Sequence, residues 1–175
     1  MLSLYDITVP NYIRMLQASI AVMKKGQEFL TENDIGLSEI TTMRLADDML
    51  PFHAQINIAC HNAVGATRAF FDGEFRPPQS SLEDIDYQGL IEHLSDSIET
   101  LNSFGKEDVD SRFGKPLIFK FNDQSTPFTA ENFAMSFATP NVYFHTTTLY
   151  DMLRIKGALL GKRDYLGQMV VGVPE

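Results

Sequence analysis

The chain has 175 residues, of which 44% are hydrophobic and 21% are charged. These values are typical of a globular protein, so we expect residues 1–175 to form a single domain with its own core. The formal net charge of −9 argues against partners such as nucleic acids or anionic membrane surfaces, because both attract proteins with a surplus of Lys and Arg.

The cysteine content and the N-terminus indicate the expected compartment. Cys60 is the only cysteine, so no disulfide can form within the chain, and a reducing environment is the simplest setting. Residues 1–10 contain neither a basic start nor a long apolar run, so we expect no signal peptide and no membrane span. The predicted localisation is therefore cytoplasmic.

The first long helix is expected to begin after Thr8, a suitable N-cap, with Pro10 in its first turn. Asn33 and Gly36 mark its end, and a polar connector follows over residues 38–44. The inward positions of this helix recur at alternating four- and three-residue steps, the spacing of one helical face. They form a stripe that is apolar except for Gln27: Val9, Ile13, Leu16, Ile20, Met23, Gln27 and Leu30.

Two more helices are expected in the middle of the chain. We place the second at residues 48–71, with Pro51 in its first turn, and end it at Asp72-Gly73. Residues 74–86 contain several Pro and Ser residues and are expected to form a loop. The third helix is placed at residues 86–104, with a short extra turn over 108–113. Its inward positions are Tyr87, Leu90, Ile91, Leu94, Ile98 and Leu101.

A small β-hairpin is expected over residues 116–130. Leu117, Phe119 and Phe121 alternate with other residues, the polar run 122–125 turns the chain, and residues 126–129 return. We expect these three apolar side chains to lie over the helices. A functional alternative is that the hairpin forms a lid over a pocket.

The last helix follows this insertion. Residues 130–138 are expected to form a short helix, and Thr139-Pro140 begins or kinks a longer helix that runs to Lys156 and ends at Gly157. Four long helices with one hairpin before the last of them predict an all-α four-helix bundle.

Two histidines interrupt apolar helical stripes and are the candidate functional residues. His53 lies between Met49 and Ile56 on the second helix, and His145 lies between Val142 and Leu149 on the last helix. This spacing turns both imidazoles toward neighbouring helices, which favours a shared polar pocket and a divalent metal ion such as zinc or nickel. The alternative is that each is a core imidazole satisfied by hydrogen bonds.

Other residues near these histidines in sequence were weighed as pocket residues. Asn57 lies one turn after His53, and Asp48 is near enough in sequence to orient it. Leu149 lies one turn after His145, where a third ligand would be expected, and Tyr150 follows it.

The remaining polar groups of the second and third helices receive other predictions. His61 is expected on the flank of its helix, and Cys60 is expected to behave as a small hydrophobic residue. His93 recurs with Ser97 and Thr100 on the third helix, which favours a solvated face.

Three segments of the chain resemble a bacterial family of domains of unknown function. The closing segment is Asn141-Val-Tyr-Phe-His145 with Tyr150, Leu153-Arg154, Gly157 and Gly161-Lys-Arg-Asp-Tyr-Leu-Gly167. The opening is similar in Ser3-Leu-Tyr-Asp, Val9-Pro10 and Met15-Leu16, and the middle in Arg44-Leu-Ala-Asp-Asp-Met49, Gln55-Ile56 and Ala59-Cys60. That family is grouped with the DinB/YfiT-like metalloenzymes, which are four-helix bundles. The resemblance implies the same fold and a homodimer.

The resemblance also implies an incomplete metal site. DinB-type proteins carry one metal-binding histidine early in the second helix and a His-x-x-x-His pair on the last helix. His53 and His145 match the first two positions, and Leu149 stands where the third histidine would be.

Three hypotheses follow from this departure. The first is an uncharacterised DinB-like protein whose polar pocket binds a small-molecule ligand without tight metal binding. The second is a metal-dependent hydrolase or thiol S-transferase whose third position is filled by Asn57, Asp48 or water. The third is a non-catalytic structural or interaction dimer.

Overall fold

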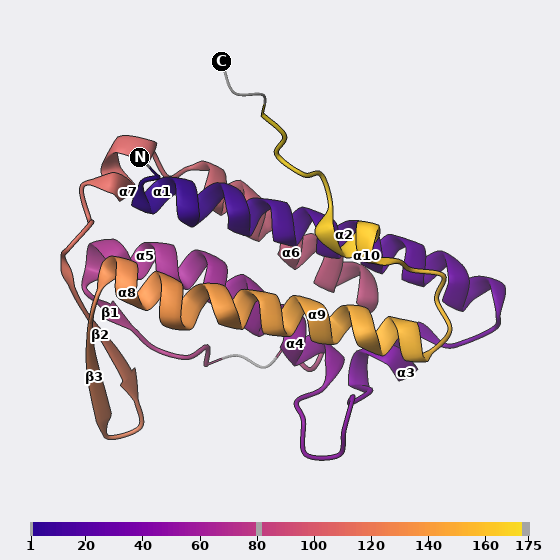
Figure 1. Cartoon of the computed structure of the whole chain (residues 1–175). Coiled ribbons are helices and arrows are strands. Elements are labelled where there is room, and N and C mark those ends of the chain that lie inside the picture. Colours follow the sequence, from indigo (N-terminus) through magenta and orange to yellow (C-terminus); the bar gives the residue numbers. More distant parts are fainter. Residues whose placement is uncertain (1, 80–81, 173–175) are drawn as a thin grey trace.

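Long helical segments make up most of the molecule. The computed structural model describes residues 2–79 and 82–172. Helix α2 packs against α6 and α9, and α4 packs against α9 and α6 (Figure 1). The segments that form this helical body are α2 (Val9–Glu32), α4 (Phe52–Cys60) with the π-helical segment η1 (His61–Gly65) and α5 (Ala66–Asp72), α6 (Tyr87–Asn102), and α8 (Ala130–Phe133) with the π-helical segment η2 (Ala134–Ala138) and α9 (Thr139–Ile155).

The core lies between these segments, where the predicted apolar stripes meet. Leu16 and Leu30 of α2 are fully buried, as the helical spacing predicts. Two buried tyrosines join helices through their hydroxyl groups. Tyr12 Oη lies 3.0 Å from Thr139 Oγ1, and Tyr87 Oη donates to the Met23 carbonyl oxygen at 2.8 Å. These bonds satisfy polar atoms that would be costly to bury alone.

The second long helix begins later than the sequence predicts. It starts at Phe52 instead of residue 48, and Asp48 lies in an exposed turn. The reason is Pro51, because a proline disfavours helical geometry in the residue before it, and its own backbone is extended at ψ 166°. The predicted polar connector also contains a short helix, α3 (Leu37–Thr42), which buries Ile40 against the core.

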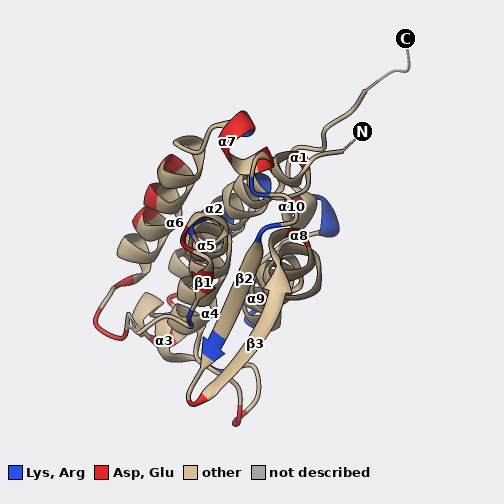
Figure 2. Cartoon of the chain, turned by 90° about the vertical axis from the view of Figure 1, so that its left-hand side faces the viewer, with Lys and Arg blue, Asp and Glu red and all other residues tan. Residues whose placement is uncertain are grey.

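A small sheet lies at the end of the helical body where α5 ends and α8 begins (Figure 2). Its strand order is β1 (Glu74–Phe75), β2 (Pro116–Phe121) and β3 (Gln124–Thr129). The predicted hairpin is confirmed, with β2 and β3 antiparallel and a tight turn at Asn122, whose φ is 51°. Strand β1 pairs in parallel with β2 and was not predicted, since two residues carry no readable alternation.

Aromatic rings attach this sheet to the helices. The Phe75 ring of β1 lies 5.0 Å from Phe133 of α8, and the Phe119 ring of β2 lies 4.7 Å from Phe137 of η2. Leu117 is buried as predicted, whereas Phe121 is 51% exposed. The hairpin therefore packs on the helices through its base, and its tip extends away from them.

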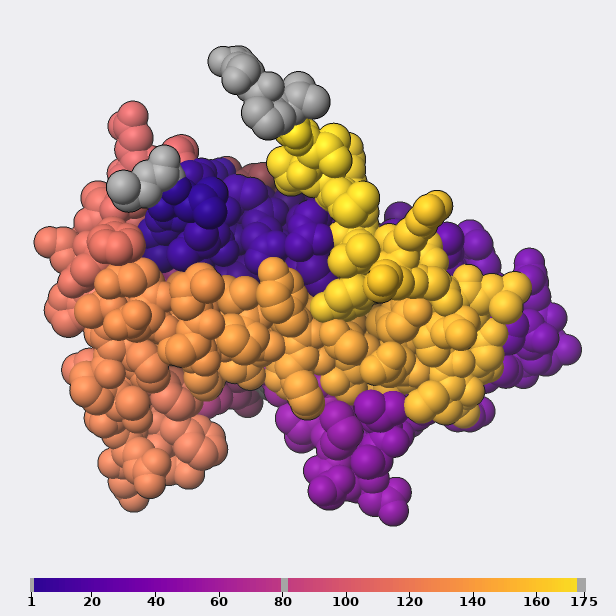
Figure 3. Space-filling model, viewed as in Figure 1, coloured from indigo at the N-terminus to yellow at the C-terminus, as the bar shows by residue number. Residues whose placement is uncertain are grey.

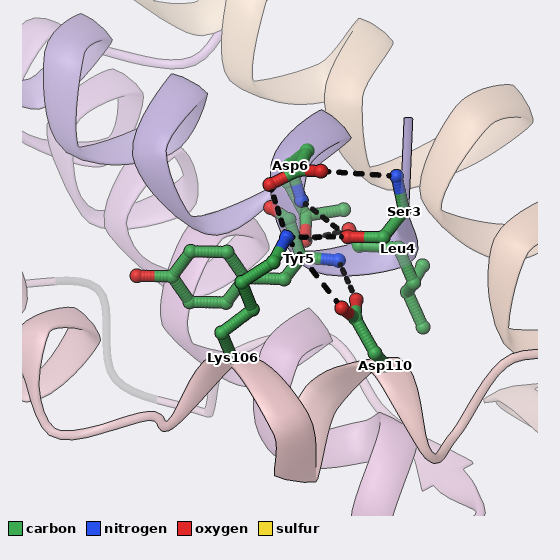
Figure 4. Close-up of polar contacts among 7 residues, drawn as sticks. Ser3, Leu4, Tyr5, Asp6, Lys106 and Asp110 are labelled. Carbon is green, nitrogen blue, oxygen red and sulfur yellow. Dashed lines mark hydrogen bonds and ion pairs between the residues drawn. The ribbon is translucent and has the colours of Figure 1, made fainter. Parts of the chain in front are cut away.

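Two short helices lie side by side near the N-terminus (Figure 1). Helices α1 (Leu4–Ile7) and α7 (Lys106–Asp110) are joined by Lys106, whose ammonium pairs with Asp6 and donates to Ser3 Oγ at 2.9 Å (Figure 4). The Tyr5 backbone N–H donates to Asp110 Oδ1 at 2.8 Å in the same cluster.

The C-terminal segment lies against α2 (Figure 3). It contains α10 (Lys162–Leu166), and Lys25 of α2 pairs with Asp164 at 2.5 Å. Arg14 donates to the Leu166 carbonyl oxygen at 2.6 Å. None of the helices in residues 2–79 and 82–172 combines the length and apolarity needed to cross a bilayer.

Candidate functional site

A cleft opens between the segment α4–η1–α5 on one side and α6 on the other. Strand β1 and the chain that follows it form the rim, and the volume of the cleft is about 710 Å³. Its polar wall includes Asn57, His61, Arg68, His93 and Asp96. Volumes of 300–1,000 Å³ are typical of small-molecule sites, so we take this cleft as the candidate site.

His61 ties the helical wall of the cleft to its rim. Its Nε2–H donates to the Arg76 carbonyl oxygen at 2.6 Å, since a carbonyl can only accept. Burial lowers the pKa of His61, the bond to Arg76 raises it, and the positive charge of Arg68 lowers it again. The imidazole is therefore neutral at pH 7, and its Nδ1 carries the lone pair.

The π-helical segment η1 gives the His61 ring its place. A Cβ on Gly65 would lie 3.2 Å from His61 Cε1 and 3.3 Å from Phe75 Cε2. A glycine at this position therefore lets the imidazole lie close over the helix and beside the Phe75 ring. Such π-helical turns insert one extra residue and occur frequently at functional sites.

His93 contributes an unsatisfied nitrogen from α6. Its Nε2 is buried and has no hydrogen-bond partner among the described residues. Burial lowers the pKa of His93, while the nearby Asp96 carboxylate raises it. The prediction of a solvated face is wrong for Ser97, which is buried, whereas His93 is half-buried in the wall of the cleft.

The sequence contained a sign that α4 and α6 approach each other closely beside His93. Cys60 on α4 and Ser97 on α6 are small residues, and small residues let two helices approach closely. Cys60 Sγ lies 4.0 Å from the His93 carbonyl oxygen. Burial raises the pKa of the Cys60 thiol to about 12, which confirms the prediction of a small hydrophobic residue and makes thiolate chemistry unfavourable.

His145 is buried, as its spacing predicts, and it is held in one tautomer. Its Nδ1 lies 2.6 Å from Gln55 Oε1, and Gln55 Nε2 donates to the Leu50 carbonyl oxygen at 2.8 Å. Because the amide nitrogen is engaged by that carbonyl, the amide oxygen must accept, so the imidazole hydrogen is on Nδ1. Burial lowers the pKa of His145 to about 4, so the ring is neutral with its lone pair on Nε2.

His53 occupies a different face of α4 from the partner of His145. It is 5% exposed and shares its face with Asn57, one turn later. Gln55 lies about 200° away around the same helix, at roughly 100° per residue. The hydrogen bond of His145 is thus made on another side of α4 from the side that carries His53.

The structure does not bring the other predicted pocket residues together in one pocket. Asn57 lines the cleft, whereas Leu149 is fully buried in the core. Asp48 is exposed, and the Tyr150 ring lies 6.0 Å from Tyr165, toward α10. Within the described part of the chain, no group of three or more His, Cys, Asp or Glu residues could hold a metal ion.

Comparison with known proteins places this chain in a family. The family described as "Domain of unknown function (DUF1993)" matches residues 4–166. The crystal structure of a DinB family member protein from Shewanella denitrificans is similar, with 28% sequence identity and a TM-score of 0.85. The alignment covers 98% of this chain and 96% of that one. No curated protein matches the chain.

Proposed function

This chain belongs to the DUF1993 family, and we propose that it is a DinB-like four-helix bundle that binds a small polar molecule in the cleft between α4–η1–α5 and α6. The bundle is supported by the packing of α2 on α6 and α9 and of α4 on α9 and α6. It is also supported by the likeness to the DinB family member over nearly the whole of both chains.

The observation that carries the proposal is the unsatisfied nitrogen of His93 in the wall of a sizeable cleft. A buried polar atom without a partner costs on the order of 1–3 kcal/mol, so such atoms are rare unless something else completes them. The His93 ring lines the cleft with its Nε2 unpartnered among the described residues. Nε2 is enclosed by protein atoms in this structure, so a ligand would hydrogen-bond to it once the imidazole turns toward the cleft.

Binding of a resident catalytic metal ion is less well supported by the donor set. The bond to Gln55 leaves His145 Nε2 with a lone pair, the arrangement that orients a metal-binding imidazole. However, Leu149, one turn along α9, supplies no ligand, and Gln55 meets His145 on a different side of α4 from His53. A catalytic zinc site usually needs three protein ligands, so we derive no reaction step through a metal ion.

Filling the cleft tests the proposed binding site. Val64 lines the cleft, and Leu159 is exposed away from it, so Val64→Trp and Leu159→Trp are matched variants that add the same ring. A fragment library is screened against the ¹⁵N-labelled protein, with circular dichroism to check folding. We expect fragments to shift amide signals of α4, η1 and α6, and Val64→Trp alone to abolish these shifts. Fragments that bind Val64→Trp as well as the wild type would refute the cleft as the site.

Metal analysis tests the absence of a resident ion. We expect protein purified without chelator or added metal to contain far less than one zinc or nickel per chain. The His145→Ala variant should contain the same amount as the wild type. Near-stoichiometric metal that is lost in His145→Ala would overturn this part of the proposal and favour the metal-dependent hydrolase or thiol S-transferase.

A homodimer is a second candidate, favoured by exposed apolar side chains on α9. Phe144 is 56% exposed and Ile155 is 65% exposed, and the two lie about three turns apart on the same face of the helix. Burying two such side chains against a second copy would remove apolar surface from water. Light scattering with size-exclusion chromatography should give a dimer mass that falls to a monomer in the Phe144→Lys/Ile155→Lys variant but not in Leu159→Lys. A monomer mass for the wild type at all concentrations would exclude it.

A further inference from the structure

Arg112 combines partial burial with an unpaired charge. Its side chain is half-buried and makes no hydrogen bond or ion pair within residues 2–79 and 82–172. Arg68 and Arg163 also have no acceptor in these ranges, but both are exposed to water. A charge that is partly withdrawn from water is costly unless it is paired. The remaining arginines each donate to an oxygen of the chain: Arg14, Arg44, Arg76 and Arg154.

Two aromatic rings fix the position of the Arg112 guanidinium. Its Cζ lies 4.8 Å from the centroid of the Phe71 ring, and Phe71 stacks on Phe104 with 5.8 Å between the ring centroids. This stack joins the end of α5 to the turn after α7, at the end of the molecule that faces the viewer in Figure 2. Of the guanidinium nitrogens, Nε is buried without a partner. The other two, Nη1 and Nη2, therefore remain open to solvent as a pair of donors.

The next residue, Phe113, is held in solvent by an ordered turn. Its side chain is 63% exposed, and that of Phe71 is 37% exposed. The Phe113 N–H donates to the Asp110 carbonyl oxygen at 3.1 Å, and the Gly114 N–H donates to Glu131 Oε2 at 2.8 Å. The exposure of Phe113 is thus a property of a fixed backbone. Aromatic residues and Arg are the side chains that are enriched in protein interfaces.

No carboxylate of the described chain accepts from Arg112. Asp110 and Glu131 are engaged by N–H groups of the chain. Lys115 is a second exposed cation without an acceptor in the described ranges, so residues 112–115 carry positive charge in a chain of net charge −9. Two nearby carboxylates do not pair with Arg112 either: the exposed Asp108, one turn earlier, and Asp72, which lines the cleft.

We propose that Phe71, Arg112 and Phe113 form a docking surface for a segment of a partner protein in which an acidic residue lies beside a large apolar one. The carboxylate accepts from Nη1 and Nη2 together, the two-pronged geometry of arginine–carboxylate pairs. The apolar side chain covers the two exposed rings, which a small anion would leave in water. This surface shares no residue with the cleft, so the inference goes beyond the proposed function and does not depend on it.

Matched peptides test the two features of the partner. Acetylated tripeptide amides with Glu in the middle and Leu, Phe or Trp at the ends are titrated into the ¹⁵N-labelled full chain, each beside its Gln counterpart. The reporters are the backbone amides of residues 111–115 and the Nε–H of Arg112. We expect the best Glu peptide to bind about tenfold more tightly than its Gln counterpart, a difference of about 1.4 kcal/mol. Replacing both end residues by Ala should weaken it by a similar factor.

Variants assign each feature to its side chain. Arg112→Gln should weaken the Glu peptide about tenfold and leave the Gln peptide unchanged, whereas Phe113→Ser should weaken both. Phe113 is exposed, so its variant keeps the test valid if Arg112→Gln does not fold. Arg163→Gln and Phe121→Ser make the same changes at other exposed positions, and they should leave every affinity unchanged.

Three outcomes would overturn the inference. The first is the absence of shifts in residues 111–115 with every Glu peptide. The second is equal affinity for the Glu and Gln peptides in the wild type. The third is self-association of the wild type that Arg112→Gln abolishes in sedimentation velocity, because the occupant would then be a second copy of this chain. Binding of fragments in the cleft is unaffected by any of these results.

Discussion

The tautomer of His145 is determined by a chain of two hydrogen bonds that ends on the backbone. Leu50 lies in the turn before α4 and accepts from the Gln55 amide, which in turn accepts from His145. The imidazole is thus joined to the loop that precedes α4 and to α4 itself. Since the ring is buried and neutral, its protonation must weaken the folded state.

We predict that His145 makes the protein less stable in mild acid. Burial lowers its pKa to about 4 in the folded state, whereas the pKa of a histidine in the unfolded chain is about 6.5. The unfolded chain therefore binds the proton more tightly, and stability present above about pH 6.5 is lost as the pH falls toward 4. The loss is of order 3 kcal/mol if the shift is fully expressed.

Urea unfolding at several pH values between 7 and 4 checks this prediction. The His145→Gln variant provides the control, because it keeps the other titrating groups, including His61 and His93. The free energy of unfolding of the wild type should fall more steeply with acid than that of the variant. Parallel profiles for the two proteins would contradict the prediction.

The inward direction of the functional candidates was readable from the sequence, but their partners were not. His53 and His145 are both buried, as the four-and-three spacing predicts. The partner of His145 depends on the rotation of α4 about its axis, which brings Gln55 within hydrogen-bonding distance of α9. The extra residue of η1 also changes the helical phase after Cys60, and a regular 3.6-residue period contains no sign of it.

At the scale of elements, the hairpin shows how far alternation alone can predict structure. The alternating residues of β2 and the polar turn identified both strands. Pairing with β1 depends on contacts between distant parts of the chain and was not predicted. The Ile118 N–H donates to the Gly73 carbonyl oxygen on the β1 side at 2.9 Å, so its antiparallel partner Pro127 turns its own backbone toward the outer edge of β3.

We predict that Pro127 protects this edge from pairing with other chains. A proline has no N–H to offer at the open edge, and prolines at such positions reduce edge-to-edge association. Pro127→Thr restores that donor and should increase self-association, measured by sedimentation velocity over a range of concentrations. Thr126→Val, whose backbone faces β2, is the control. Equal association of all three proteins would contradict the prediction.

We also predict that Lys106 holds α1 and α7 together without affecting the core. Its ammonium contacts Ser3, Asp6 and Asp110 at the surface (Figure 4). Lys106→Met should therefore increase amide hydrogen exchange in residues 4–8 and 106–110 and leave the melting temperature nearly unchanged.

The matched control for this cluster is Lys162→Met, which removes an exposed ammonium from the start of α10. It should leave exchange in both segments unchanged. If Lys106→Met also left both segments fully protected, the cluster would contribute nothing to their attachment.

At the scale of the whole molecule, the helices could be predicted but their contacts could not. The long apolar stripes located α2, α6 and α9 within a few residues, because each buries one continuous face. The arrangement of these helices depends on a few positions of very close approach. Gly26 is the clearest of them, since a Cβ there would lie 2.9 Å from Leu153 Cδ1 and 3.2 Å from Tyr87 Oη.

We predict that Gly26→Val destabilises the protein by about 2 kcal/mol, within the usual cost of overpacking a core. The added methyl groups would force apart α2, α6 and α9, which meet at this point. Lys24→Val places the same side chain on an exposed position of α2 and should change the stability by less than about 0.5 kcal/mol. Urea denaturation of both variants measures the difference, and similar midpoints would refute the prediction.

The parallel pairing of β1 with β2 has a consequence for the order of folding during synthesis. The two strands are separated along the chain by α6 and α7, so β1 has no partner until the ribosome has released the hairpin. Closing so long a loop is slow and entropically unfavourable compared with forming local helices. The rim at Arg76 would thus be among the last parts to fold, and a nascent chain that ends before residue 116 would have a cleft that lacks its folded rim.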